Sequence, residues 1–361
     1  MTEEKIKKVL SDIKDPVLDR DYESLGFVKN ISLNGKDLSL TLGISDISEN
    51  IVAIASENVK NEFKKSLPEI DNVKVSFVSG FTEQKNSKKE GIMPGVKNTI
   101  AIASGKGGVG KSTVAVNLAI ALADKGAKVG LIDADIYGPS IPIMFGVNEK
   151  PGVTKIGDKN KLVPLEKYGV KIMSIGFLME ENTAVVWRGP MASSALKQFI
   201  GDVIWGELDF LLFDMPPGTG DIQLTLSQTI PLTGAVIVTT PQDISLADAR
   251  KGYIMFERVN VPTIGIIENM SYYLNTDGSR EYIFGKDGGR KMSSEFKVKL
   301  LGEIPINTKV RIGGDEGIPI VKGDPSSEVS KIYSSTADEI IREINLLNVT
   351  SRQGDGIEIE I

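Results

Sequence analysis

GKGGVGKS occupies residues 105–112 and fits the pattern G-x-x-x-x-G-K-[ST]. The apolar run TIAIA at 99–103 predicts a strand before it, and Val114, Leu118 and Leu122 share one side of a predicted helix after it. Glycines let backbone N–H groups wrap around phosphate oxygens, and the first turn of the helix adds positive potential. The stretch therefore predicts a nucleotide-phosphate site formed by Gly105, Lys106, Gly107, Gly108, Val109, Gly110, Lys111, Ser112 and Thr113.

Two side chains of this stretch have predicted roles. Lys111 is placed to reach the β- and γ-phosphates, and the hydroxyl of Ser112 is placed to ligate Mg²⁺. ATP with Mg²⁺ is therefore the expected cofactor, and Lys111 is an expected catalytic residue.

From Asn98 onward, short apolar runs alternate with helical stretches. Runs this apolar are typical of strands that are buried on both faces of a parallel sheet. They predict an α/β fold in which a doubly wound, mostly parallel sheet has helices on both faces. The runs are TIAIAS, KVGLID, VKIMSIG, FLLFD, GAVIVTT, PTIGIIEN and KLLGEI.

Carboxylates end two of the predicted strands. LIDAD at 131–135 places Asp135 at the carboxyl edge of the sheet, beside the phosphates. Because the chain has no histidine, a carboxylate is needed to orient the attacking water, and Asp135 is the best candidate for this catalytic role. Asp133 is expected to support the loop or the metal shell, unless both aspartates only cap the following turn. FLLFD at 210–214 predicts that Asp214 holds Mg²⁺ through a water molecule.

A loop rich in Pro and Gly, MPPGTGD at 215–221, follows the second of these strands. It combines restricted and flexible backbone positions, which suits a segment that senses the γ-phosphate. Asp221 is expected to help to hold the loop and not to act in catalysis. IIENMS at 266–271 ends a further strand with Asn269, whose amide can read an adenine edge or only turn the chain.

Changes of pattern along the chain predict its domains. Residues 1–82 have the order helix–strand–strand–helix–strand and predict a small α+β domain. Residues 83–97 are polar, contain Gly and Pro, and predict a linker. The nucleotide-binding domain is expected at 98–347. Residues 348–361 are expected to form a tail, whose alternating isoleucines either add an edge strand or lie in a disordered terminus.

The composition excludes several chemistries, because the 361 residues contain no cysteine and no histidine. Disulfides, thiolate nucleophiles, Cys/His zinc sites and Cys-ligated iron–sulfur clusters within this chain are excluded, as are Ser-His-Asp mechanisms. The net charge of −6 disfavours general nucleic-acid binding. No secretory signal opens the chain and no apolar run is long enough to span a membrane. We therefore expect a cytoplasmic protein that binds neither nucleic acid nor membrane.

Longer blocks contain or flank these motifs: GKGGVGKST, LIDADIYGPSIP, VKIMSIGFL, VVWRGPMASSALKQF, LDFLLFDMPPGTGDIQLTLSQ, IIENMSYY, IFGKDGG and GEIPINTKVRIGGDEGIPIV. Together they resemble the Mrp/ApbC-type P-loop ATPases, a family of iron–sulfur cluster carriers in the ParA/MinD superfamily. The resemblance runs from about Asn98 to Val321. The first 82 residues, with KDPVLDRDYESLGFVKNI, resemble the small domain that is often fused to these ATPases and linked to iron–sulfur assembly.

The resemblance implies an ATP-hydrolysing homodimer with protein partners or client apoproteins in iron–sulfur assembly. GKGGVGKST resembles the deviant Walker A motif of this class, in which the early lysine, here Lys106, reaches the partner's nucleotide and acts in catalysis. The resemblance also implies that Asn269 lies at the adenine and Pro305 near the base.

The family further implies a C-x-x-C pair shortly after the NMS block, and two such pairs in a dimer hold a bridging cluster. Asn275 and Gly278 stand at about these positions, and the usual cysteine of the small domain is missing near Ile47 and Ser48. Iron–sulfur clusters need thiolates, with histidine as an occasional substitute. The family's iron–sulfur cluster is therefore not expected to be ligated by this chain.

Three functions are compatible with the sequence. The first is a nucleotide-switched ATPase of the cluster-carrier and assembly family. The second is a cysteine-less, ATP-dependent scaffold or regulator that uses the cysteines of a partner. The third is a ParA/MinD-like positioning ATPase, which the mixed charge of residues 326–347 disfavours, because a membrane-targeting tail would be cationic.

Overall fold

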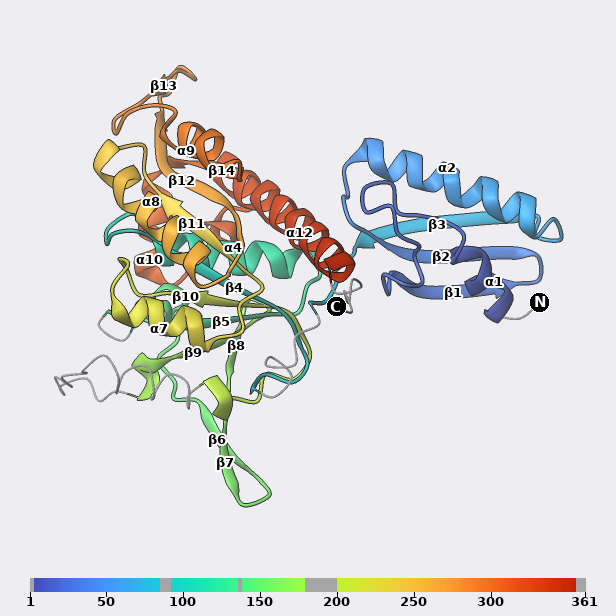
Figure 1. Ribbon diagram of the computed structural model, residues 1–361, viewed down its shortest axis with the longest axis horizontal. Helices are drawn as coiled ribbons and strands as arrows, with labels where there is room; N and C mark the ends of the chain where they lie inside the picture. Colours follow the sequence, from blue (N-terminus) through green and yellow to red (C-terminus); the bar gives the residue numbers. More distant parts are fainter. Residues whose placement is uncertain (1–2, 85–91, 136–137, 179–199, 355–361) are drawn as a thin grey trace, which may run out of the picture. The chain divides into compact units, whose positions relative to one another are not determined.

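The structure is a computed structural model that describes residues 3–84, 92–135, 138–178 and 200–354. The chain divides into two compact units: the first contains residues 1–83 and 341–361, and the second contains residues 84–340 (Figure 1). Three predictions concern segments that lie outside the described residues in whole or in part. They are the middle of the expected linker at 85–91, the VVWRGPMASSALKQF block at 185–199 and the end of the expected tail at 355–361.

The first unit is built on a three-stranded sheet with the order β1-β2-β3. β1 and β2 are antiparallel, whereas β2 and β3 are parallel and are connected through α2. Leu38, Leu40 and Leu42 alternate with more exposed residues and face the core, against apolar residues of α1 and α2. This order confirms the predicted helix–strand–strand–helix–strand pattern. The elements are α1 (Glu3–Leu10), β1 (Val28–Asn34), β2 (Asp37–Ile44), α2 (Glu49–Ser66) and β3 (Asn72–Ser79).

The last turns of α12 (Glu328–Gly354) belong to the first unit from Ile341 onward. Leu346 and Val349 pack into the core of that unit. The tail was expected to begin at 348, but the helix continues to Gly354, and Val349 lies in the core of the first unit.

Asn345 connects these turns to the segment after β3. Its side-chain oxygen accepts hydrogen bonds from the backbone N–H of Thr82 at 2.9 Å and from the Thr82 hydroxyl at 2.8 Å. Its amide nitrogen donates to the carbonyl of Gly80 at 2.8 Å. The Asn345 side chain is fully buried, and the Thr82 hydroxyl also accepts a hydrogen bond from the amide nitrogen of Asn348 at 2.9 Å.

The described part of the second unit contains a nine-stranded sheet with the order β13-β12-β11-β4-β10-β5-β9-β8, and β14 pairs with β12. Within this sheet the two pairs β12–β13 and β8–β9 are antiparallel and the others are parallel, which confirms the predicted fold class. Every residue of β5, β10 and β11 is buried, and most residues of these strands are apolar. The strands are β4 (Val96–Ala103), β5 (Val129–Asp133), β8 (Leu165–Lys167), β9 (Val170–Ser174), β10 (Leu208–Asp214), β11 (Gly234–Thr239), β12 (Thr263–Leu274), β13 (Arg280–Glu281) and β14 (Lys299–Ile306).

Helices cover both faces of this sheet. The connection from β4 through α4 to β5 crosses the sheet toward one edge, and the connection from β10 through α7 to β11 crosses it toward the opposite edge. Because both crossovers are expected to be right-handed, α4 and α7 lie on opposite faces of the sheet. Figure 1 shows α7 and α8 on the near side of the sheet and α4 behind it. The direction reverses between β4 and β10, where a crevice for ligands forms at the carboxyl ends of the strands. The helices are α4 (Lys111–Asp124), α5 (Ile141–Phe145), η1 (Ile175–Leu178), α7 (Asp221–Thr229), α8 (Asp243–Arg258), α9 (Gly288–Phe296), α10 (Thr308–Glu316) and α11 (Ile320–Gly323).

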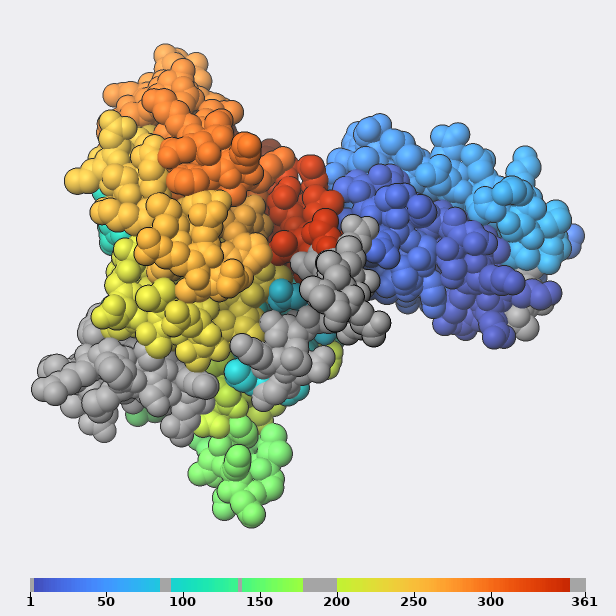
Figure 2. Space-filling view, viewed as in Figure 1, coloured from blue at the N-terminus to red at the C-terminus, as the bar shows by residue number. Residues whose placement is uncertain are grey.

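Two further features complete this unit. β4 begins at Val96, within the segment that was expected to be a linker. β6 (Gly152–Ile156) and β7 (Lys159–Val163) form a separate antiparallel hairpin that projects from the rest of the unit (Figure 2).

None of the helices in the described ranges has the length and apolar character needed to cross a bilayer.

Asn345→Ala is expected to lower the free energy of unfolding of the first unit by about 2–4 kcal/mol, because three buried hydrogen bonds between Asn345 and the groups of Gly80 and Thr82 are lost. Amide hydrogen exchange in β2 and β3 measures this change. Thr350→Ala is the control: Thr350 is exposed on the same helix, and its replacement should change stability by less than about 0.5 kcal/mol. Equal protection in Asn345→Ala and wild-type protein would contradict the assignment of these turns to the first unit.

Candidate functional site

The loop between β4 and α4 depends on glycine at defined positions. Gly108 and Gly110 have φ angles of 79° and 81°, in the left-handed region that other residues rarely adopt. A Cβ atom on Gly110 would lie 2.3 Å from the side-chain nitrogen of Asn269, and one on Gly105 would lie 2.1 Å from the backbone of Asp248 in α8. The loop encloses a cavity of about 220 Å³ lined by Ser104, Lys106, Gly107, Gly108, Val109, Gly110, Lys111, Ser112, Thr113, Asp135, Ser140, Met144 and Pro217.

A buried ion pair lies beneath this loop, between the ammonium of Lys111 and the carboxylate of Asp214 at the end of β10. The side chains are 6% and 0% exposed. Complete burial raises the pKa of Asp214, whereas the charge of Lys111 and the hydroxyl of Ser112 act in the opposite direction. Lys111 also contacts the hydroxyl of Ser112 at 3.3 Å.

The carboxylate of Asp214 is also part of the predicted Mg²⁺ site. Oδ2 of Asp214 is buried and has no hydrogen-bond partner among the residues that the structure describes. An unpartnered carboxylate oxygen beside a serine hydroxyl is a donor set of the kind that Mg²⁺ prefers. Ser112 and Asp214 therefore fit the predicted Mg²⁺, directly or through a water molecule.

Asp133 lies beside Asp214, because β5 and β10 pair in parallel with these two residues in register. Its carboxylate accepts hydrogen bonds from the backbone N–H groups of Asp135 and Ile141, both at 3.2 Å, and from the hydroxyl of Ser174 at 3.1 Å. Burial, and next the charge of Asp214, raise the pKa of Asp133 to about 7. Asp133 thus holds the loop that carries Asp135.

Asp135 and Lys106 lie at the rim of the phosphate cavity with Pro217 of the proline-glycine loop. Asp135 accepts a hydrogen bond from the backbone N–H of Gly138 at 3.3 Å. The ammonium of Lys106 forms no ion pair with any described residue, and its backbone carbonyl accepts from the Ser104 hydroxyl at 2.9 Å.

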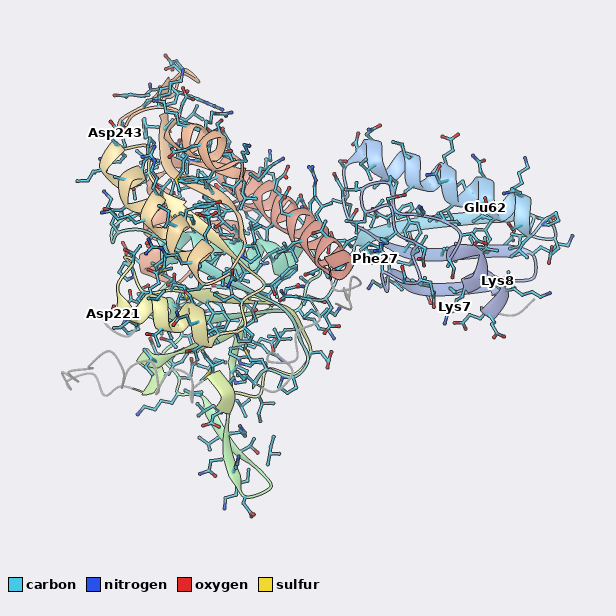
Figure 3. The ribbon with its side chains drawn as sticks, viewed as in Figure 1. Lys7, Lys8, Phe27, Glu62, Asp221 and Asp243 are labelled. Carbon is cyan, nitrogen blue, oxygen red and sulfur yellow. The ribbon has the colours of Figure 1, made fainter. Side chains whose placement is uncertain are left out.

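Asp221 occupies the first turn of α7, at the carboxyl edge of the sheet, as Figure 3 shows. It is exposed and lies outside the residues that line the phosphate cavity.

Asn269 and Pro305 lie far apart in the sequence but line one cavity of about 510 Å³ beside Gly110 and Thr113. The amide nitrogen of Asn269 donates to the carbonyl of Val109 at 2.8 Å. The pairing of β12 with β14 shifts register after Asn269, and the next residue has a φ of 54°.

Sequence reasoning assigned no role to several other residues of this second cavity. They lie within the IIENMSYY, IFGKDGG and GEIPINTKVRIGGDEGIPIV blocks or near α5, but no local pattern indicates that these segments meet. A mostly apolar cavity with a few polar groups is typical of a site for a planar base. The additional lining residues are Ser140, Ile143, Met144, Met270, Phe284, Ile306, Asn307, Val310, Arg311, Gly314 and Asp315.

The positions implied for the C-x-x-C pair form a tight turn between β12 and β13. The N–H of Gly278 donates to the carbonyl of Asn275 at 3.0 Å, and Gly278 has a φ of 82°. Asp277 accepts hydrogen bonds from the N–H and hydroxyl of Ser279 at 2.8 and 2.6 Å. Across the described ranges no three or more His, Cys, Asp or Glu side chains are grouped to hold a metal ion. The turn offers oxygen atoms and no thiolate, so it does not fit an iron–sulfur cluster.

Comparison with known families agrees with this geometry. Residues 95–341 match the family described as ParA: NUBPL iron-transfer P-loop NTPase. The chain belongs to this family. Residues 3–77 of this P-loop NTPase match a second family, described as iron-sulfur cluster assembly protein. Both matches confirm the resemblances inferred from the sequence blocks.

Relatives of this P-loop NTPase cover most of its length. An iron-sulfur cluster carrier protein from Synechocystis is 42% identical over 349 residues, which are 96% of this chain and 99% of the relative. An iron-sulfur cluster carrier protein from Escherichia coli is 51% identical over 262 residues, 72% of this chain and 70% of the relative. A solved nucleotide-binding protein from Archaeoglobus fulgidus, in complex with ADP, is 38% identical with a TM-score of 0.58 and covers 68% of this chain and 95% of its own.

Lys111→Ala is expected to lower the free energy of unfolding of the second unit by about 3–5 kcal/mol in the absence of nucleotide, because Asp214 is left buried and unpaired. Adding Asp214→Asn to the same chain should restore most of that loss, since asparagine carries no charge. Urea unfolding without nucleotide or Mg²⁺ measures both variants. If the single and double variants are equally unstable, the buried ion pair does not have the importance assigned to it.

Proposed function

We propose that this P-loop NTPase is a dimeric switch protein of the iron–sulfur cluster carrier and assembly family that binds and hydrolyses ATP. The observation that carries the proposal is the buried Lys111–Asp214 pair beneath the glycine loop, with Asp135 at the rim of the same cavity. The matched family and the ADP complex of the Archaeoglobus fulgidus relative support an adenine nucleotide as the ligand.

In the proposed reaction, the backbone N–H groups of the loop and Lys111 bind the β- and γ-phosphates. Ser112 and Asp214 would hold Mg²⁺, which would supply positive charge beside the phosphates. Asp135 accepts a hydrogen bond from a water molecule and directs its oxygen toward the γ-phosphorus. The bond from that oxygen to phosphorus forms while the bond to the β–γ bridging oxygen breaks, which releases ADP and phosphate.

Two further roles complete the proposed nucleotide site. Asn269 and Pro305 line the cavity next to Gly110, and we assign that cavity to the adenine, with the amide of Asn269 directed to the base edge. Lys106 lies at the rim of the phosphate cavity without an ion-pair partner among the described residues. We assign this lysine to the nucleotide of a second subunit, where its charge stabilises the transferred phosphoryl group.

Whether the protein itself ligates an iron–sulfur cluster is a separate question. The relatives are named iron-sulfur cluster carriers, but this chain has no cysteine or histidine. The turn at Asn275–Gly278 favours a second candidate function: an ATP-dependent scaffold that works with a partner or client protein whose cysteines ligate the cluster. Both candidates share the ATP-driven switch and differ in where the thiolates come from.

Asp135→Ala and Lys106→Ala are each expected to bind Mg-ATP but to hydrolyse it poorly, because one removes the water-orienting group and the other removes a cation supplied by the partner. Mixing them should restore roughly a quarter of wild-type activity, since half of the dimers are mixed and each holds one complete site. Phosphate release measures the activity. Absence of recovery in demonstrated heterodimers would contradict action in trans, and absence of hydrolysis by wild-type protein would contradict the ATPase itself.

Anaerobic reconstitution with iron and sulfide is expected to leave no stable [4Fe–4S] cluster on the protein, because a bridging site needs about four thiolates. The double variant Asn275→Cys, Gly278→Cys should bind iron and sulfide as a dimer, with some backbone strain because Gly278 has a φ of 82°. Asn275→Cys alone is the matched control. Iron and sulfide analysis with visible absorption is the measurement, and stoichiometric loading of the unaltered chain would mean that thiols from outside the protein act as ligands.

A further inference from the structure

Gln223, the third residue of α7, has a buried side chain that nothing in the proposed site uses. The residue is 2% exposed. Neither its amide nitrogen nor its amide oxygen has a hydrogen-bond partner in the described structure. Its backbone carbonyl accepts from the Ser227 hydroxyl at 2.8 Å, which holds the helix but leaves the carboxamide unpaired.

An unpaired buried carboxamide lowers stability, because it has lost its hydrogen bonds to water without gaining others. A methionine of similar size and shape would remove that penalty. Leu226, about one turn further along the same helix, is a buried apolar side chain on the same face. The carboxamide of Gln223 is therefore expected to have a partner outside the described residues, and a bound ligand can supply it.

The surroundings of Gln223 indicate what that partner is. Gln223 is one of the residues that line a cavity of about 590 Å³, together with Asp135, Pro217, Gly220 and Asp221. Asp135 and Pro217 also line the phosphate cavity, so the two cavities share a wall where the phosphate chain is expected to end. The ligand at that point carries oxygen atoms that need donors.

The hydrogen-bonding capacity of an amide matches this place. Ionised Asp135 and Asp221 can only accept hydrogen bonds, whereas a carboxamide offers two N–H donors and one acceptor without adding negative charge. A water molecule that is oriented by Asp135 and directed toward a γ-phosphate has an O–H for the acceptor, and the phosphate oxygen accepts from the N–H. Glutamine has this water-positioning role in other phosphoryl-transfer enzymes.

We propose that Gln223 is a further catalytic residue of the ATPase, one that hydrogen-bonds the attacking water and a γ-phosphate oxygen opposite Asp135. This inference rests on the proposed function. The carboxamide neither gains nor loses a proton: it stabilises the arrangement in which the water oxygen bonds to phosphorus as the β–γ bridging bond breaks.

Gln223→Met tests the assignment. We expect the single-turnover rate of ATP hydrolysis to fall about tenfold or more, with the Kd for Mg-ATP within about twofold of wild type. The melting temperature of the nucleotide-free protein should be unchanged or higher, because the unpaired amide is gone. Gln228→Met, on the exposed face of the same helix, is the matched control and should leave the rate unchanged.

Gln223→Glu adds a readout that a structural role would not change. A neutral carboxylic acid keeps one donor and one acceptor, whereas the carboxylate has no donor and repels the γ-phosphate. The rate of this variant relative to wild type should therefore rise as the pH falls and the introduced group is protonated.

The outcomes separate the two proposals. A wild-type rate in Gln223→Met overturns the role of Gln223 and leaves the ATPase standing. A loss of rate that comes with a lower melting temperature and weaker ATP binding also overturns it, since the side chain would then be structural. A wild-type protein that hydrolyses no ATP overturns both the proposed function and the role of Gln223.

Discussion

The contact between the Lys111 ammonium and the Asp214 carboxylate is the constraint on which the nucleotide site depends. It joins the first residue of α4 to the last residue of β10, at the point where the winding of the sheet reverses. Two opposite charges can be this deeply buried only when each compensates the other. A triphosphate with Mg²⁺ offers both groups alternative partners, so the pair also prepares the site for its proposed ligand.

Around that pair, several buried polar groups lie at the carboxyl edge of the sheet. Asp133 is held by Ser174 and two backbone N–H groups, whereas Oδ2 of Asp214 and the carboxamide of Gln223 have no described partner. Each unpaired group lowers the stability of the nucleotide-free protein. Such groups are common where a protein is preorganised for a ligand, because the ligand supplies the missing hydrogen bonds.

The absence of cysteine separates the two halves of the family's chemistry. The nucleotide half needs backbone N–H groups, lysine, serine and aspartate, and in this P-loop NTPase Lys111, Ser112 and Asp135 line one cavity. The cluster half needs soft thiolate ligands, and the turn at Asn275–Gly278 offers an amide and backbone groups instead. A chain with this composition offers no thiolate for a cluster.

Local patterns in the sequence determined the elements and the fold class. The glycine loop between an apolar run and an amphipathic helix predicted the phosphate site, and apolar runs such as LDFLLFD predicted strands buried on both faces, because these signals depend on near neighbours. Only the tertiary structure showed which distant side chains meet. Asp133 contacts Ser174, Asn269 contacts Val109, and Asn345 contacts Thr82, in pairs separated by 41, 160 and 263 positions. The register between strands and the docking of the last turns of α12 determine these contacts. Only the folded chain likewise shows that the buried carboxamide of Gln223 has no described partner. Periodicity in the sequence can indicate that a residue is buried, but not whether its polar atoms are paired.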